Sequence, residues 1–156
     1  MTKSKVSIII PHYNGIEVLS QCLDSLFQST YPNIEVIVVD NGSSDDSVDW
    51  LKTNHSQVIV IENDKNLGYA GGCNVGALAA SGEYLLFLNN DTIHNPDFVE
   101  LLADFLDLNS KVAAVQPKIL NYFHKDQFDY AGGAFTTTAN GVETSITPKT
   151  KRKIYF

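Results

Sequence analysis

The chain has 156 residues, of which 44% are hydrophobic, and its formal net charge is −7. This length suits one domain, and the apolar content excludes a disordered chain. The acidic balance argues against nucleic-acid binding, which needs a basic surface. A polyanionic ligand would therefore have to be held by helix N-termini, backbone amides or a metal ion.

The composition also bears on location. Apolar runs stay well below the ~18 residues of a membrane-spanning helix, and Cys22 and Cys73 lack the spacing of a metal site. We therefore expect a cytoplasmic protein in a reducing setting. The basic cluster Lys149–Lys153 is the one local hint of contact with the inner face of a membrane.

The first half of the chain alternates apolar strands with amphipathic helices. Residues 6–10 are rich in β-branched apolar side chains, typical of a strand buried on both faces. Pro11 should end this strand because proline cannot donate in a central ladder. A second such strand covers 34–40, and Ser44 suits the N-cap of a short helix after it. Between the strands, i, i+3, i+4 spacing predicts a helix over 16–29 with a buried stripe of Val18, Leu19, Cys22, Leu23, Leu26 and Phe27.

The second half continues the alternation. Strands are expected at 58–62, 84–88 and 111–116, and a small-residue helix at 72–80 with Gly82 as its left-handed stop. Asn95 should cap the next helix, whose buried stripe comprises Phe98, Leu101, Leu102, Phe105 and Leu106.

The resulting order, β-α-β-α-β-α-β-α-β, predicts an α/β fold with an open, mainly parallel sheet and helices on both faces. After Pro117 the pattern weakens to a hairpin or an irregular excursion, and the basic tail has no partner that the sequence identifies.

Four polar loops follow the predicted strands, at 11–15, 40–43, 64–68 and 89–91. Ligands of open α/β sheets bind at the carboxyl ends of the strands, where these loops should meet. Each loop alone is more simply explained as a turn, because Asp, Asn and Gly are ordinary turn residues. Four of them at one edge indicate a binding site.

Other site patterns are missing. The loop "PHYNG" has neither the G-x-G-x-x-G spacing nor a Walker-type P-loop, and "GYAGGCNVG" also lacks the former. A phospho-receiver would need acidic residues after the first strand, and a nucleotidyltransferase would need a glycine-rich basic loop there. Composition does not exclude a two-carboxylate glycosidase, but no acid pair defines one.

Four successive segments carry a resemblance: "VSIIIPHYNG", "IEVIVVDNGSSDDSVDWL", "NLGYAGGCNVGALAASGEYLLFLNNDT" and "NPDFVELL". In order and spacing they resemble family 2 glycosyltransferases with the GT-A, Rossmann-like fold, and "FDYAGG" is similar to the rhamnosyltransferase-like branch. The resemblance implies transfer of a sugar, with inversion, from a nucleotide-diphosphate donor to a hydroxyl of a glycan or lipid-linked acceptor. It does not select UDP, dTDP or GDP.

The resemblance also assigns roles by position. Asp40 matches the aspartate that accepts a hydrogen bond from the base, and Pro11, Tyr13 and Asn14 match the loop bordering the nucleoside. Residues 89–91 replace an acidic D-x-D-type motif, in which Asp91 alone keeps a charge. The implied nucleotide-binding residues are Pro11, Tyr13, Asn14, Asp40, Ser43, Asn66, Gly68, Asn74 and Asn90.

A carboxylate beside a diphosphate is repelled by ~4 kcal/mol per charge pair at 4 Å and an effective dielectric near 20. A divalent cation between them reverses the sign, so we expect Asp91 to bind Mg²⁺ or Mn²⁺ together with phosphate oxygens and water.

Inversion also requires a general base. No segment matches the family's acidic acceptor-side motif, so we expect the base beyond Phe156. Asp126 and Asp129 fit a solvated loop better, and His12 and His94 fit polar rim positions.

The chain thus divides into a nucleotide-sugar-binding domain at 1–120 and a truncated start of an acceptor-side region at 121–156. The alternative that stays open is a non-catalytic nucleotide-binding or interaction module on the same fold.

Overall fold

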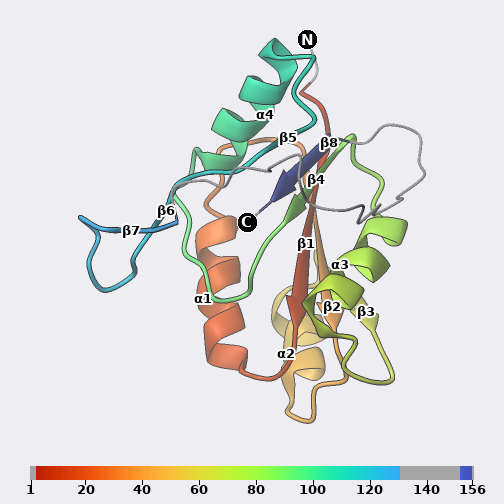
Figure 1. The fold of residues 1–156 in the computed structure, drawn as a ribbon. Helices are drawn as coiled ribbons and strands as arrows, with labels where there is room; N and C mark the ends of the chain where they lie inside the picture. The colour runs from red at the N-terminus through yellow and green to blue at the C-terminus, as the bar shows by residue number, and fades with distance from the viewer. Residues whose placement is uncertain (1–2, 131–151, 156) are drawn as a thin grey trace, which may run out of the picture.

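The computed structural model describes residues 3–130 and 152–155. Its six-stranded sheet consists of β1 (Val6–His12), β2 (Ile34–Asp40), β3 (Ile59–Glu62), β4 (Tyr84–Phe87), β5 (Ala114–Val115) and β8 (Arg152–Tyr155). The strand order is β3-β2-β1-β4-β8-β5, and every neighbouring pair is parallel (Figure 1). The predicted open, mainly parallel sheet is therefore confirmed.

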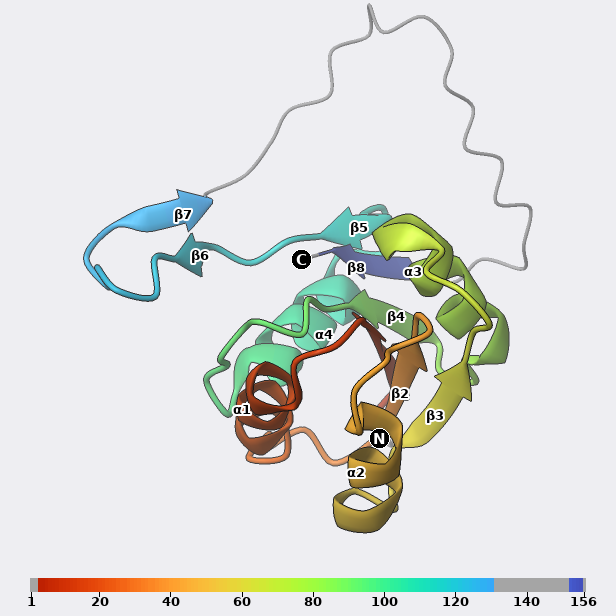
Figure 2. The same cartoon turned by 90° about the horizontal axis from the view of Figure 1, so that it is seen from below.

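Helices cover both faces of the sheet, as predicted. They are α1 (Ile16–Leu26), α2 (Ser47–Asn54), α3 (Gly68–Ala79) and α4 (Phe98–Leu108). Ile8 and Ile10 of β1 face a core formed with α1, α2 and α4, whereas Ile9 faces a second core formed with α3. Figure 2 shows α3 alone on its side of the sheet. A central strand with a core on each face needs the continuous apolar run seen in the sequence.

The prediction that Pro11 ends the first strand is wrong, because β1 continues to His12. The carbonyl of His12 accepts the Asn41 N–H of the β2 side at 2.8 Å, whereas the carbonyl of Ile9 accepts the Leu88 N–H of the β4 side at 2.9 Å. By this alternation Pro11 points to the β4 side, beyond the last residue pair of that ladder, Ile9 with Phe87. Its missing N–H therefore interrupts no pair of the ladder among the described residues.

Several predicted helix boundaries are also wrong. α1 ends at Leu26, α2 begins at Ser47, and α3 begins at Gly68. Asp97, with no side-chain capping bond, precedes α4 in the N-cap position predicted for Asn95.

Gly82 does not have the left-handed conformation expected of it. A Cβ atom at this position would lie 2.7 Å from the backbone nitrogen of Ser7. The glycine is needed because this turn passes directly against β1.

The buried stripes are partly wrong as well. Val18 is 43% exposed, and on α4 Leu101 and Phe105 are 62% and 46% exposed. The face of α4 that packs against the sheet consists of Val99, Leu102, Ala103 and Leu106. Since apolar residues lie on both sides of this helix, its periodicity alone does not fix which side faces the sheet.

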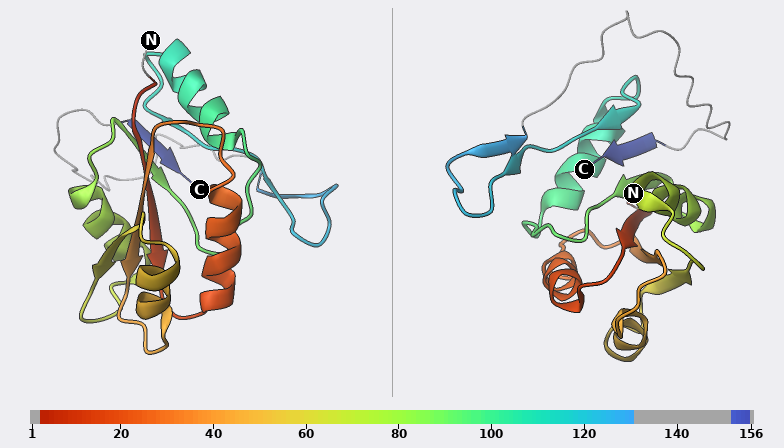
Figure 3. Two further views of the ribbon diagram at one scale, coloured as in Figure 1. Left: turned by 180° about the vertical axis from the view of Figure 1, so that it is seen from behind. Right: turned by 60° about the horizontal axis from the view of Figure 1, so that its bottom comes forward.

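The chain after Pro117 forms an antiparallel hairpin, as expected, from β6 (Ile119–Leu120) and β7 (Phe128–Tyr130). The hairpin projects from the body of the sheet (Figure 3). The tail, for which the sequence identified no partner, pairs as β8 between β4 and β5. The predicted division at residue 120 stays a prediction, and the end of the rhamnosyltransferase-like segment, residues 131–133, lies outside the described residues.

No helix among residues 3–130 and 152–155 combines the length and the hydropathy that a bilayer crossing needs. The expected membrane contact rests on Lys149–Lys153, of which residues 149–151 lie outside the described residues. It stays a prediction.

Candidate functional site

The site lies where β1, β2 and β4 end at one edge of the parallel sheet. The chain runs outward from β1 through β2 to β3, and then returns to place β4 on the other side of β1. This reversal is the switch point at which open α/β sheets bind ligands. The loops after His12, Asp40 and Phe87 surround it, so three of the four loops predicted from the sequence meet there.

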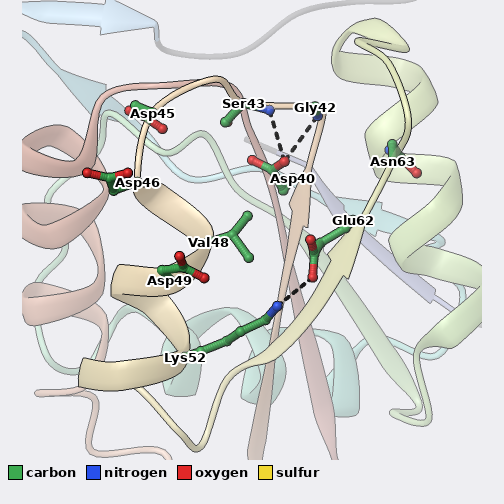
Figure 4. A pocket seen from close by; sticks show the side chains of 10 residues that line it. All are labelled: Asp40, Gly42, Ser43, Asp45, Asp46, Val48, Asp49, Lys52, Glu62 and Asn63. Atoms are coloured by element: carbon green, nitrogen blue, oxygen red, sulfur yellow. Dashed lines mark hydrogen bonds and ion pairs between the residues drawn. The ribbon is translucent and has the colours of Figure 1, made fainter.

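Asp40 ends β2 with its carboxylate only half satisfied. The residue is 3% exposed, and its Oδ2 accepts the N–H groups of Gly42 at 3.1 Å and Ser43 at 2.9 Å (Figure 4). Its Oδ1 is buried and has no hydrogen-bond partner among the described residues. A buried acceptor left unpaired costs on the order of 1–3 kcal/mol. The oxygen is therefore ready to accept a hydrogen bond from a ligand.

A cavity of about 290 Å³ adjoins Asp40, between α2 and the ends of β2 and β3. Asp45 and Asp46, which precede α2, and Asp49 within it line the cavity on the α2 side (Figure 4). Its cation, Lys52, is already paired with Glu62 at 2.7 Å. This acidic lining suits an uncharged group such as a nucleobase or a ribose and disfavours phosphate.

The loop after β1 is fastened to the loop after β2. Asn14 has a left-handed backbone, with φ of 56°, and donates its N–H to Ser43 Oγ at 2.8 Å. Its Oδ1 accepts the Ser44 N–H at 2.8 Å, and Gly15 donates to Asp45 Oδ2 at 2.7 Å. Two predicted site residues, Asn14 and Ser43, thus contact each other directly.

The segment leading into α3 is ordered by two asparagines. Asn66 Oδ1 accepts the Gly68 N–H at 2.8 Å, and Gly68 starts the helix with φ of 70°. Asn41, which is 3% exposed, donates to the Gly68 carbonyl at 3.3 Å and accepts from Asn63 at 3.0 Å. This buried link between β2 and α3 was not predicted from the sequence.

The other expected nucleotide-binding residues differ in their surroundings. Tyr13 is 50% exposed beside the switch point. Pro11 is buried against α3, where a Cβ atom on Gly72 would lie 2.9 Å from its ring. Asn74 is exposed on α3 and does not line the cavity beside Asp40.

His12 is 1% exposed, so its expected place on the polar rim is wrong. Its Nδ1 lies 3.0 Å from Asn90 Nδ2, and its Nε2 lies 3.0 Å from Ser47 Oγ. Burial lowers the pKa of this imidazole, against the opposing effect of Asp40 and Asp45. A neutral histidine therefore connects the loop after β4 to α2. No pattern in the sequence indicated that His12 is buried, because the burial results from the packing of three elements.

Asp91 follows Asn90 and is exposed. Its carboxylate makes no hydrogen bond or ion pair in the part of the chain that the structure describes, and no cluster of three metal-ligating side chains occurs there. One free carboxylate at the edge still fits Mg²⁺ or Mn²⁺, because these ions bind through few carboxylates plus phosphate oxygens and water.

A second cavity, of about 530 Å³, lies between the Asp91 loop and the β6–β7 hairpin. His94 on its wall stacks on Phe98 and hydrogen-bonds Ser25 Oγ at 2.9 Å, and burial lowers its pKa to about 4. Asp129 also lines this cavity and accepts a hydrogen bond from Asn121 at 3.1 Å. The cavity places apolar, cationic and acidic groups next to Asp91.

Sequence comparison finds relatives that are longer than this chain. GlyG of Streptococcus pneumoniae serotype 4, a glycosyltransferase, is 32% identical over 127 residues, which cover 80% of this chain and 41% of GlyG. The poly(ribitol-phosphate) beta-glucosyltransferase of Bacillus spizizenii is 43% identical over 93 residues, covering 56% of this chain and 15% of that protein. The chain thus spans less than half the length of these relatives.

Solved structures share the fold. The crystal structure of S. aureus TarS 1-349 superposes with a TM-score of 0.66 at 26% identity, covering 75% of this chain and 36% of that one. The same TarS fragment in complex with UDP-GlcNAc gives a TM-score of 0.65. The mannosyltransferase PcManGT from Pyrobaculum calidifontis, solved with GDP-Man and Mn²⁺, gives 0.67 at 24% identity, which shows the fold alone.

The family model of glycosyl transferase family 2 matches residues 7–153, which include β1 except for its first residue, β2 to β5 and every residue of the switch-point site. With the relatives and the shared fold, this match leaves one assignment: the chain belongs to glycosyl transferase family 2.

Proposed function

We propose that this chain binds the donor of an inverting, metal-dependent glycosyl transfer. A sugar moves from a nucleotide-diphosphate sugar to a hydroxyl of a glycan or lipid-linked acceptor. The names of the relatives support the transfer, since GlyG and the Bacillus protein are glycosyltransferases. TarS, a structural neighbour, was solved with UDP and with UDP-GlcNAc, which supports a nucleotide-sugar donor.

The unpaired Oδ1 of Asp40 carries the proposal. It is buried and can only accept a hydrogen bond, so it selects a base that presents a ring N–H. Uracil, thymine and guanine have such a group, whereas cytosine and adenine in nucleotides do not. We therefore expect UDP, dTDP or GDP to bind in preference to CDP or ADP. The acidic cavity beside Asp40 would hold the uncharged part of the nucleotide.

On the β4 side of the switch point, Asp91 would hold Mg²⁺ or Mn²⁺. The cation supplies positive charge for the leaving diphosphate. The exposed amino end of α3, with Gly68 ordered by Asn66, adds N–H donors suited to phosphate oxygens. The chain's own part is therefore to orient the donor between Asp40 and Asp91.

Thermal-shift titration of the purified chain tests this assignment. Each nucleoside diphosphate is added with and without Mn²⁺ or Mg²⁺, and a ligand at ~100 times its Kd should add ~2.7 kcal/mol of stability. We expect the largest, metal-dependent shift with one of UDP, dTDP and GDP. The absence of any shift with all three would refute donor binding.

Three matched variants assign the residues. Asp40→Asn places an amide N–H where the base donates, and a lost charged hydrogen bond of about 1.5–3 kcal/mol weakens nucleotide binding by roughly 10- to 100-fold. Asp91→Asn should remove the metal dependence and leave metal-free binding intact. Asp24→Asn, on the exposed face of α1, is the control and should bind as the natural protein does.

Full metal dependence in Asp91→Asn would contradict the role given to that residue. Nucleotide binding without turnover in the full-length protein would favour the non-catalytic alternative.

A further inference from the structure

The buried imidazole of His12 is hydrogen-bonded at both ring nitrogens, and its partners come from different elements. Ser47 is the first residue of α2, and Asn90 belongs to the loop after β4. A rigid ring can present an acceptor at one end and a donor at the other. Asn and Gln side chains each reach only one of those two positions.

The donors and acceptors define a direction. The Asn90 amide nitrogen can only donate, so His12 Nδ1 accepts from it and the ring proton is on Nε2. Nε2 then donates to Ser47 Oγ at 3.0 Å, and the Ser47 hydroxyl donates to Asp45 Oδ1. Asp45 Oδ2 accepts the N–H of Gly15 at 2.7 Å. These hydrogen bonds form a relay, meaning a continuous series of contacts with no proton transfer implied. It runs from the loop that contains Asp91, through β1 and α2, to the loop that borders Asp40.

The loop after β4 is also held on both sides of Asn90. Leu88 bonds to Ile9 of β1 at 2.9 Å, and the Asn89 carbonyl accepts hydrogen bonds from Cys22 Sγ at 3.6 Å and from Thr92 Oγ1 at 2.8 Å. Thr92 Oγ1 also lies 2.9 Å from His94 Nε2. Asn90 lies between these positions. In the described part of the chain, its side chain makes one hydrogen bond, which joins it to His12. Asp91 is the next residue and makes no such bond of its own there.

We propose that His12 is a positioning residue, which holds Asn90 against β1 and thereby sets the position of the Asp91 carboxylate at the switch point. The inference rests on the proposed function, because the position of Asp91 matters if it holds a cation beside the donor. A group bonded directly to a metal ligand typically contributes 10- to 100-fold in metal affinity. His12 acts through the neighbouring Asn90, so we expect an effect at the lower end of that range.

Two substitutions at His12 separate the two ends of the ring. In His12→Asn, the amide oxygen takes the place of Nδ1, so the acceptor for Asn90 is kept and the bond to Ser47 is lost. In His12→Gln, the amide nitrogen takes the place of Nε2, so the donor to Ser47 is kept and the acceptor for Asn90 is lost. Both variants remove the same buried ring, and each is therefore the control for the loss of packing in the other.

The measurement is the apparent Kd of Mn²⁺ at a saturating concentration of UDP, or of dTDP or GDP if one of them binds better. His12→Gln should raise this Kd by about tenfold, whereas His12→Asn should change it by less than about threefold. Metal-free nucleotide binding should stay within about twofold in both. Equal effects in the two variants would overturn the proposal.

Asn90→Ala removes the same contact from the surface side, without touching the buried ring, and should raise the Kd of Mn²⁺ by about as much as His12→Gln does. Combining the two substitutions should add little further loss, because they break one interaction. Additive losses would refute the coupling.

Nitrogen NMR of the imidazole gives a readout that needs no metal. We expect the proton on Nε2, and a proton on Nδ1 would overturn the direction of the relay. If the natural protein binds none of the nucleotides, the proposed function fails. If it binds with metal dependence but Asn90→Ala and His12→Gln leave the Kd of Mn²⁺ unchanged, this inference alone fails.

Discussion

Replacing Glu35 with glutamine should destabilise the fold at neutral pH far more than at acid pH. Glu35 lies near the start of β2, at the opposite end of the sheet from the site, and its side chain is 12% exposed. Its Oε1 accepts the N–H groups of Ser81 at 2.7 Å and Gly82 at 3.2 Å, and Ser7 Oγ donates to the same oxygen. Its Oε2 pairs with Lys5 Nζ at 2.7 Å. One carboxylate thus joins β1, β2 and the turn before β4.

The magnitude follows from its pKa. Burial raises the pKa of Glu35, but the hydrogen bonds from Lys5, Ser7 and Ser81 outweigh burial and lower it from 4.5 to about 2. Between these values the unfolded chain binds more protons than the folded protein, so stability falls as the pH drops through this window. The charged form contributes about 3 kcal/mol at pH 7, of which about 1 kcal/mol remains at pH 3.

Urea unfolding, followed by the fluorescence of Trp50, measures this contribution. The difference in unfolding free energy between the natural protein and Glu35→Gln should shrink by about 2 kcal/mol from pH 7 to pH 3. Glu83→Gln, an exposed carboxylate next to the same turn, is the control and should change little at either pH. A constant difference for Glu35→Gln across this range would refute the reasoning.

Two further predictions concern packing and acid stability. A Cβ atom at Gly76 would lie 3.1 Å from Val39 Cγ2 and closer still to Ile9, so Gly76→Ala should cost about 1–3 kcal/mol by overpacking. Leu78→Ala, at a 90% exposed position of the same helix, should cost less than about 0.5 kcal/mol in the same urea assay. Burial lowers the pKa of His94 from 6.5 to about 4, so the unfolded chain binds the extra proton first, and up to about 3 kcal/mol is lost as the pH falls from 6.5 to 4. His94→Gln should reduce the loss of unfolding free energy between pH 6.5 and pH 4. The same pH dependence in the variant and the natural protein would show that this histidine is not responsible.

Local patterns in the sequence determined the strands and the edge that carries the site. The central strands needed apolar side chains on both faces, so β1, β2 and β4 were visible as continuous runs. Parallel order then brought the loops at Asn14, Asp40 and Asp91 to one edge, since right-handed crossovers leave few alternatives. These predictions succeeded because each depends on neighbours in the chain or on topology.

Tertiary structure decided what depends on contacts between distant segments. Packing of three elements buries His12, and the pairing of β8 between β4 and β5 gives the basic tail a partner. The close approach of Ser7, rather than the end of a helix, requires the glycine at position 82. The free oxygen of Asp40 also appears only in the fold, because the burial that isolates it comes from residues that the sequence places far from it.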